Sequence, residues 1–347
     1  MTARTDDPAL PTVLVTGAGG AAAVTVLRSL TGHANLVAGD IDPVAVGLYL
    51  APAGSRVLLP RGDDPEFVSI LLRAAIEHGA DVVVPTVDTE LRGVSAAREE
   101  FAAHGIALLV ESVETLDMCL DKAALMTACA GAVRVPRTVL LDGSTTPADV
   151  AALGEPFIIK PRAGAGGRGF EILLDASALT THPYDGTLIA QELLPGAEYS
   201  IDVLARPGGG VVAAVPRRRD KIDSGIAVAG RTFADPELVE FGRAVAAVIG
   251  AQGVVNVQAK LDREGKPSLL EVNARFPGTM ALTQAAGIDM PLLAVRAVLG
   301  DQLPESLPFR EVAVVRHWED IVVPIEEYAQ IDAATAVDTE PDLAVAR

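Results

Sequence analysis

The feature that most restricts the fold of this chain is an alternation of short apolar runs and helix-like segments in its first third. The apolar runs are typical of buried strands, and they span residues 12–16, 36–38, 57–59, 81–85 and 106–110. The helix-like segments 64–78 and 91–104 each end at a glycine, Gly79 and Gly105, which is a common way for a helix to stop. Repeated β–α units of this kind predict a parallel sheet covered by helices on both faces.

From residue 115 the pattern changes to that of a mixed α+β region. Residues 116–132 are predicted to be helical, and strands are predicted at 139–141, 157–160, 170–174, 188–194, 198–204 and 211–215. The runs 253–261 and 268–272 are predicted to form an antiparallel pair, since a short polar turn joins them. The fold class expected is therefore α/β followed by α+β.

Composition excludes several classes of partner. The 347 residues are half hydrophobic, with a net charge of −18 and a pI near 4.6, so neither nucleic acid nor an anionic membrane is an expected partner. Two cysteines, Cys119 and Cys129, suit a reducing compartment. The scattered histidines argue against zinc, and no secretory leader or membrane span is evident. We expect a cytoplasmic protein.

The first strand leads into a glycine turn that has two interpretations. Gly17, Gly19 and Ala22 satisfy the GxGxx[G/A] pattern, and Asp40 follows where a ribose-binding acid belongs. One interpretation is a dinucleotide site in an NAD(P)-dependent oxidoreductase or epimerase. The other is a tight β–α turn at the start of an open parallel sheet, which at most touches a substrate anion. We favour the second, because later segments compete for the nucleotide and because no Tyr-x-x-x-Lys motif is present.

The loop after the fourth strand contains candidate substrate contacts. Loops at the carboxyl ends of parallel strands are where such sheets bind ligands, and Asp88, Thr89 and Glu90 lie in this loop. The carboxylates suit an ammonium group. An equally good alternative is that they cap the next helix and favour its dipole.

The stretch from Phe157 to Glu171 joins a lysine to a glycine-rich turn. An apolar strand ends in Lys160, and Gly164, Gly166, Gly167 and Gly169 follow with Arg168 among them. The lysine supplies a point charge, and glycines let backbone amides approach phosphate oxygens. Taken alone the stretch could be a mere connection between strands.

The run 270–275 places three polar side chains at alternate positions. Strand alternation predicts that Glu271, Asn273 and Arg275 share a face, and Gln258 joins them if the hairpin register brings it opposite Glu271. Oxygen donors beside a guanidinium suit Mg²⁺ and a phosphoryl group. The alternative is a solvent-exposed strand face.

Motifs in a fixed order give the chain a family resemblance. They are Lys122 in an LDK turn, Lys160 before the glycine turn, QELL at 191–194, Glu198, GVVNVQ at 253–258 and EVNAR at 271–275. The ordered set resembles the ATP-grasp superfamily, most closely its carbamoyl phosphate synthetase large-subunit and biotin carboxylase branch of carboxylate–amine ligases.

The resemblance implies a domain organisation. Residues 1–115 would form the Rossmann-like pre-ATP-grasp domain and residues 116–330 the ATP-grasp module. Within the module, 116–190 would be the smaller subdomain with a flap at 163–169, and 191–330 the larger one. Residues 331–347 are expected to be a flexible tail. A homodimer is expected on the resemblance alone.

The resemblance also implies roles for single residues. Contacts to ATP would come from Lys122, Lys160, Gly164, Gly166, Gly167, Arg168, Glu192, Leu193, Leu194 and Glu198. Glu192 and the backbone of Leu194 would read adenine, and Glu198 would accept hydrogen bonds from the ribose. Gln258, Glu271 and Asn273 would bind Mg²⁺, with Mn²⁺ as an alternative ion. Arg275 and Lys160 would be the catalytic residues.

The function implied is activation of a small carboxylate, such as an amino acid or a peptide-like acid, as an acyl phosphate. An amine would then displace phosphate, and ADP would be the nucleotide product. Arg219, Ser224 and Gly225 join the loop at 86–90 as candidate substrate contacts, although the three arginines 217–219 are equally typical of a solvated face. A thiol acceptor, or a non-catalytic ATP-binding protein, are the alternatives within this fold.

Overall fold

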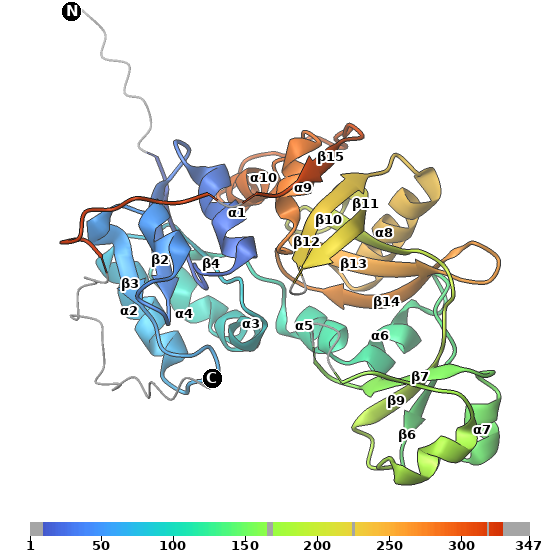
Figure 1. Ribbon diagram of the computed structural model, residues 1–347. Helices are drawn as coiled ribbons and strands as arrows, with labels where there is room; N and C mark the ends of the chain where they lie inside the picture. The colour runs from blue at the N-terminus through green and yellow to red at the C-terminus, as the bar shows by residue number, and fades with distance from the viewer. Residues whose placement is uncertain (1–9, 165–168, 224–225, 318, 329–347) are drawn as a thin grey trace, which may run out of the picture. The chain divides into compact units, whose positions relative to one another are not determined.

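The computed structural model describes residues 10–164, 169–223, 226–317 and 319–328 (Figure 1). Its contacts divide the chain into two compact units, Met1–Leu108 with Glu319–Arg347, and Leu109–Trp318. The first unit ends before residue 115, where we predicted the boundary. Two hydrogen bonds that hold the segment after residue 108 to the rest of the second unit explain this earlier boundary. Glu111 Oε2 accepts from Gln252 N, and Thr115 Oγ1 donates to Ile249 O, both at 2.9 Å.

The first unit contains the predicted parallel sheet. Its strands are β1 (Thr12–Val15), β2 (Asn35–Asp40), β3 (Arg56–Leu58), β4 (Val82–Val84) and β5 (Ala107–Leu108). They pair in parallel in the order β3-β2-β1-β4-β5. The strand order reverses between β1 and β4, so the loops after these two strands meet at a topological switch point.

Helices and short 3₁₀ turns connect these strands. They are α1 (Ala21–Leu30), η1 (Val46–Leu50), η2 (Ala53–Ser55), α2 (Phe67–Glu77), α3 (Asp88–Ala96) and α4 (Arg98–Ala103). Helix α1 packs on β1 and β2 through buried Val26, Leu27 and Leu30. The single helix expected over 91–104 is divided into α3 and α4 at Ala97.

The C-terminal segment of the described chain returns to the first unit. Arg56, which is buried, donates to both the carbonyl and the carboxylate of Glu327, at 3.3 and 3.1 Å. The ring of Tyr328 stacks on that of Tyr49 at 6.2 Å. Glu319–Tyr328 thus belong to the first unit, together with Met1–Leu108. The expected tail at 331–347 lies outside the described residues.

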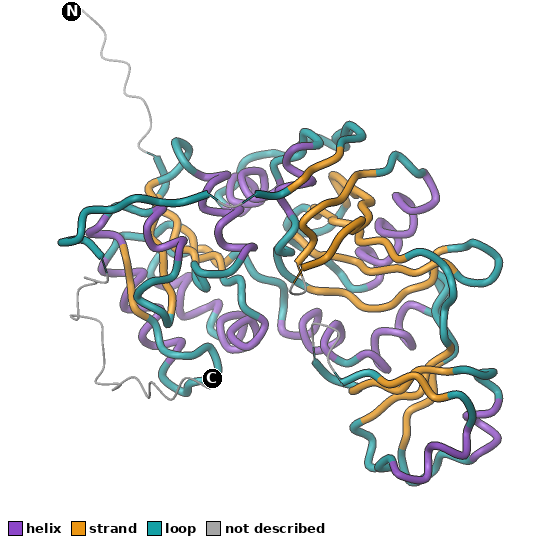
Figure 2. Tube along the Cα trace, viewed as in Figure 1, coloured by secondary structure: helices purple, strands orange, loops and turns teal. Residues whose placement is uncertain are grey.

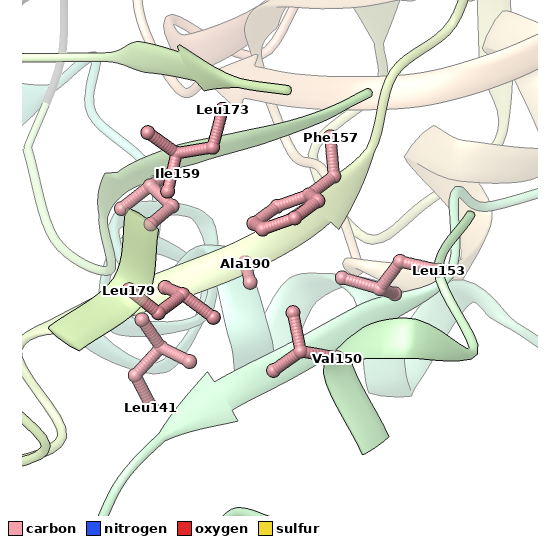
Figure 3. Close-up of a cluster of buried hydrophobic side chains, with 8 residues drawn as sticks. All are labelled: Leu141, Val150, Leu153, Phe157, Ile159, Leu173, Leu179 and Ala190. Carbon is pink, nitrogen blue, oxygen red and sulfur yellow. The ribbon is translucent and has the colours of Figure 1, made fainter. Parts of the chain in front are cut away.

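The second unit contains a four-stranded antiparallel sheet in the order β6-β9-β7-β8. Its strands are β6 (Thr138–Leu141), β7 (Phe157–Pro161), β8 (Glu171–Leu173) and β9 (Leu188–Glu192), accompanied by α7 (Pro147–Ala151) and η3 (Ala176–Thr181). Alternate residues of β7, Phe157 and Ile159, point into an apolar core with Leu141, Val150 and Leu153 (Figure 3). Strand alternation therefore turns Lys160 to the opposite face.

A six-stranded sheet in the order β14-β13-β10-β11-β12-β15 forms the larger part of the second unit. Its strands are β10 (Glu198–Ala205), β11 (Val211–Asp223), β12 (Ile226–Thr232), β13 (Val254–Leu261), β14 (Pro267–Asn273) and β15 (Ala313–Val315). Helix α8 (Pro236–Val248) packs along β10, β11 and β13 (Figure 2). A Cβ added at Gly242 would lie 2.6 Å from Ile201 Cγ2, so this face is closely packed.

Four further helices complete the second unit: α5 (Val113–Leu120), α6 (Lys122–Cys129), α9 (Met280–Ala285) and α10 (Met290–Val298). The continuous helix expected over 116–132 is broken at Asp121, which has extended backbone angles and caps α6 instead. Among the described residues, no helix is both long enough and apolar enough to cross a bilayer.

Candidate active site

Lys122 is held at the start of α6 by the residue before it. The Asp121 carboxylate accepts hydrogen bonds from Ala123 N and Ala124 N at 3.0 and 3.1 Å, as an N-cap does. Its other oxygen accepts from Arg162, at 2.9 Å from Nε and 2.6 Å from the terminal nitrogen. Lys122 N donates to Arg162 O at 2.9 Å. These contacts tie the helix start to the chain that follows β7.

Lys122 and Lys160 share one electrostatic environment with Glu271. Burial lowers the pKa of the Lys160 ammonium to about 8, against a raising effect of Glu271 and a further lowering by the Lys122 charge. Burial also lowers the pKa of Lys122, while Glu271 and Asp121 raise it. Lys122 Nζ donates to Gly164 O at the start of the glycine turn. Two ammonium groups and one carboxylate therefore converge, which leaves a positive site suited to an anion.

The β13–β14 hairpin aligns the predicted metal ligands. Its register pairs Gln258 with Glu271 and Asn256 with Asn273, so the side chains of these four residues lie on one face. A bulge follows, because Ala259 pairs with Leu269. Gln258 therefore lies opposite Glu271, which is the position it needed in order to join the predicted metal ligands.

This donor set contains one carboxylate and two side-chain amides. Among the described residues there is no cluster of three His, Cys, Asp or Glu side chains that could hold a metal ion. The set fits Mg²⁺ shared with phosphate oxygens, because Mg²⁺ is usually bound through one or two carboxylates plus substrate phosphates. Arg275 follows β14, is partly buried, and donates to Phe276 O at 3.2 Å.

The carboxylate of Glu192, at the end of β9, has an arginine as its partner. Glu192 pairs with Phe157 across β9 and β7, which places both side chains on the core face, opposite Lys160. Arg137 Nε donates to Glu192 at 3.0 Å, and this hydrogen bond lowers the pKa of the carboxyl. Leu194 is buried, and contact of Glu192, Leu193 and Leu194 with adenine stays a prediction.

Residues 192–197 join the four-stranded sheet to the six-stranded sheet, and we call this segment the hinge. A cavity of about 750 Å³ borders it. Its lining includes the segment from Ala130 to Arg137, Glu192, Leu194, the hairpin turn 262–264 and Ser268. The three arginines in the lining face three carboxylates, so its charge is balanced.

The three consecutive arginines of β11 occupy three different environments. Arg217 is buried and paired with Asp202. Arg218 pairs with Asp220 and lies 5.6 Å from the ring centre of Phe233. Arg219, on the same strand face as Arg217, pairs with Glu198. Strand alternation explains the division. β11 includes the whole arginine run and is therefore longer than the strand predicted at 211–215.

The glycine turn of the first unit has its own amides satisfied. Ala18 N donates to Gly39 O at 3.1 Å and Gly20 N to Gly17 O at 2.8 Å, while Gly19 N donates to Asp40 Oδ2 at 2.7 Å. Gly17 has a φ of +61°, and a Cβ there would lie 2.5 Å from Val87 Cγ2. Close packing and these hydrogen bonds account for the glycine at position 17.

Glu90 has a capping role in the described structure. Its Oε1 accepts from Thr16 Oγ1 at 2.5 Å, Thr86 N at 2.8 Å and Val87 N at 2.9 Å. The residue is buried, and burial raises the pKa of its carboxyl against the lowering by these hydrogen bonds. Of the two interpretations left open, the geometry favours the capping one for Glu90. Substrate contact by Asp88 or Thr89 stays a prediction.

Five predicted site residues lie outside the described residues: Gly166, Gly167, Arg168, Ser224 and Gly225. Sequence reasoning also missed residues that the structure brings to the site. Arg162 carried no signal in the sequence, because its ion pair with Asp121 joins residues far apart in the chain. Asp202 and Asn256 are polar residues within otherwise apolar strands, and this pattern is visible in the sequence.

Models of two protein families match separate parts of the chain. Residues 13–109 match a family described as the PylC-like N-terminal domain, and residues 185–321 match a family described as an ATP-grasp in the biosynthetic pathway with Ter operon. The first match covers the parallel sheet. The second covers the hairpin with Gln258 and Glu271.

Curated relatives and a solved structure agree with these matches. The chain is 29% identical over 171 residues to a D-alanine–D-alanine ligase of Gloeobacter violaceus, covering 43% of this chain and 56% of the relative. It is 23% identical over 252 residues to the carbamoyl phosphate synthase large chain of Rhodopirellula baltica, covering 66% and 23%. The chain thus spans about half of one relative and a quarter of the other. A Campylobacter jejuni biotin carboxylase complex shares the fold, with a TM-score of 0.69, 20% identity and coverage of 85% and 72%.

Proposed function

We propose that this chain, a member of the ATP-grasp superfamily, is an ATP-dependent ligase that activates a small carboxylate and joins it to an amine, releasing ADP and phosphate. The observation behind the proposal is the convergence of Lys122 and Lys160 with Glu271. The two cations come from the start of α6 and from β7, and the carboxylate comes from the β13–β14 hairpin.

The position of each of these groups supports a specific role in the reaction. Lys122 and Lys160 would hold phosphate oxygens, and their partial burial strengthens that attraction because the local dielectric is low. Gln258, Glu271 and Asn273 would hold Mg²⁺, which when bound neutralises charge on the phosphates. Arg275 would stabilise the negative charge that develops on the carboxylate as it becomes an acyl phosphate.

The reaction needs positioning more than acid–base chemistry. A carboxylate is a poor acyl donor at neutral pH, and phosphorylation of its oxygen creates a leaving group that an amine can displace. The chain would contribute chiefly by holding both reactants in line and by neutralising charge. No step in this scheme requires an activated nucleophile from the protein.

The substrates are proposed by class. One relative's name specifies the joining of two D-alanines, which supports a carboxylate and an amine of amino-acid size. Candidate contacts are Arg219, beside Glu198, and Asp88 and Thr89 in the first unit, with Ser224 and Gly225 from the sequence alone. Mn²⁺ in place of Mg²⁺, a homodimer and a cytoplasmic location are further proposals.

The direct test is the identity of the nucleotide product. The protein would be incubated with ATP, Mg²⁺ and pooled amino acids and small carboxylates, and ADP and AMP would be separated by chromatography. We expect ADP and phosphate to appear only with particular pools, and subdividing those pools would identify the substrate. Hydroxylamine would trap an acyl phosphate as a hydroxamate.

Two variants of the same hairpin make the test specific. Glu271→Gln should abolish turnover, whereas Glu264→Gln, in the exposed turn, removes a carboxylate that accepts from Arg134 and should not. If AMP and pyrophosphate were the products, the carboxylate would be activated by adenylation, and the proposed mechanism would be refuted. Turnover that persists in Glu271→Gln would refute the site, and a thioester product would make the acceptor a thiol.

A further inference from the structure

Asp202 lies at the centre of a buried polar network in the six-stranded sheet. Its side chain is fully buried, and four donors surround it. Arg217 donates twice at 2.9 Å, Asn256 Nδ2 at 2.7 Å and Thr283 Oγ1 at 2.6 Å. We call these four residues the Asp202 network. It joins strands β10, β11 and β13 to helix α9.

Stability alone is a weak explanation for this network. Taking an Asp–Arg pair out of water carries a desolvation penalty that can exceed the attraction between the two charges, and well-packed apolar residues often serve as well. Apolar residues already fill the opposite face of the same strands, where Ile201 and Val203 pack closely at Gly242. A buried charge on the polar face therefore calls for a role specific to that face.

The network leads directly to the proposed metal ligands. Asn256 is opposite Asn273, and Gln258 is opposite Glu271. Gln258 Nε2 lies 3.5 Å from Asn256 Oδ1 and donates to it. On the other side, Thr283 belongs to α9, which begins at Met280, shortly after Arg275.

Hydrogen-bond polarity gives this connection a direction. An ionised carboxylate only accepts, so Asp202 requires the amide of Asn256 to turn its Nδ2 inward. Asn256 Oδ1 is then the atom that faces Gln258, and it accepts from Gln258 Nε2. Gln258 Oε1 is consequently left for another partner. A glutamine can ligate a metal ion through its oxygen and not through its NH₂ group.

We propose that Asp202 is a positioning residue that acts through Asn256 to present the oxygen of Gln258 to the metal ion bound with ATP. The inference rests on the proposed function, because it requires a metal–nucleotide site at Glu271. Asp202→Asn removes the acceptor-only group, so the amides of positions 256 and 258 lose their fixed orientation while the volume of the network is unchanged.

The test is the affinity for Mn²⁺ in the presence of ADP, measured by electron paramagnetic resonance on the full chain. Outer-shell substitutions typically weaken metal binding by about 10–100-fold, and we expect about 10-fold weaker Mn²⁺ binding in D202N. The decisive comparison is with Q258E. A carboxylate offers oxygen in either orientation and cannot donate to Asn256 Oδ1, so D202N should not weaken Mn²⁺ binding when Q258E is already present.

Two other variants separate positioning from simple structural support. T283V removes one donor to Asp202 but leaves the two amides linked, so it should lower the unfolding temperature without changing Mn²⁺ affinity. N256A breaks the link without touching the ion pair, and it should weaken Mn²⁺ binding in the same way as D202N. N256A also provides the measurement if D202N does not fold.

The outcomes separate the inference from the proposed function. If the unmodified chain binds Mn²⁺ with ADP but D202N and N256A bind it equally well, the positioning role is refuted and the ligase proposal stands. A loss of affinity that is as large with Q258E as without it would also refute the role. If the unmodified chain binds no Mn²⁺ with ADP, the metal–nucleotide site itself is refuted, and the positioning role with it.

Discussion

Two glycine-rich turns follow apolar strands in this molecule, and they differ in what surrounds them. In the first unit, the amides of Ala18, Gly19 and Gly20 all donate to oxygens of the protein. In the second unit, β7 leads to its turn with Lys160, and Lys122 donates to the turn at Gly164. The first turn is closed by its own hydrogen bonds. The second has a buried lysine and a partly buried lysine beside it.

The difference shows what a glycine pattern by itself can indicate. Glycine permits positive φ and close approach, and both properties serve packing as well as phosphate binding. Gly17 is required because Val87 and Thr86 lie where its Cβ would be. Charge beside the turn therefore separates a candidate nucleotide site from a structural turn better than spacing does.

The largest effect is expected when one of the two lysines beside the second turn is removed. Lys160→Ala removes one of the two cations, and losing one such charge-stabilising group typically lowers turnover by about 100-fold or more. The measurement is ADP release at saturating substrate, with circular dichroism to verify folding. Turnover within a factor of three of the unmodified chain would refute the role of Lys160.

A substitution in the first turn should affect stability and leave nucleotide binding unchanged. Gly17→Ala combines an unfavourable φ with steric overlap, and overpacking alone costs about 1–3 kcal/mol. Gly32→Ala is the matched control, since Gly32 has a φ of +78° but nothing within 4 Å of its Cβ position. It should cost only about 1–2 kcal/mol of conformational strain.

Urea unfolding would compare these two variants, and calorimetry would measure their affinity for ADP. If Gly17→Ala weakens nucleotide binding while its folding is intact, the first turn is a ligand site after all, and the comparison between the two turns fails.

The lowered pKa of Lys160 predicts a pH dependence for nucleotide binding. Phosphate prefers the charged lysine, and the lysine of the free protein loses its proton around pH 8. Affinity for ADP should therefore be steady below that pH and fall by up to about tenfold per pH unit above it. Calorimetry between pH 6.5 and 9.5 tests this, and Lys160→Arg, which stays charged, should flatten the profile.

The smallest effect is expected at the hinge. Because Arg137 holds the Glu192 carboxylate near the surface, Glu192→Gln should change ADP affinity by less than about twofold. It should change stability by less than about 1 kcal/mol, as is typical of ion pairs close to the surface. Arg137→Gln is the paired control, since it removes the other half of the same contact. A tenfold loss of affinity in Glu192→Gln alone would restore the side-chain role in binding adenine.

The fold was predictable from local patterns to a large extent. Short apolar runs separated by helices that stop at glycine lead to a parallel sheet, since few other arrangements bury such runs. The alternation of Glu271 and Asn273 likewise determined that they share a face. These inferences depend on neighbours in the sequence, whose geometry the backbone period sets.

Contacts between distant segments could not be predicted in the same way. The return of Glu327 to Arg56, the cap that turns Asp121 toward Arg162 and the pairing of Glu192 with Arg137 each join residues whose partners no local period specifies. Strand register also decided that Arg217, Arg218 and Arg219 meet three different partners.

What the sequence by itself determined was the order of the elements and the type of chemistry that their polar residues suit. What only the tertiary structure decided was which of those residues meet. Lys122, Lys160 and Glu271 come from three separate segments, and the burial that lowers the pKa of both lysines exists only after the chain has folded. Electrostatic interactions depend on distance and dielectric, and neither is a property of the sequence alone.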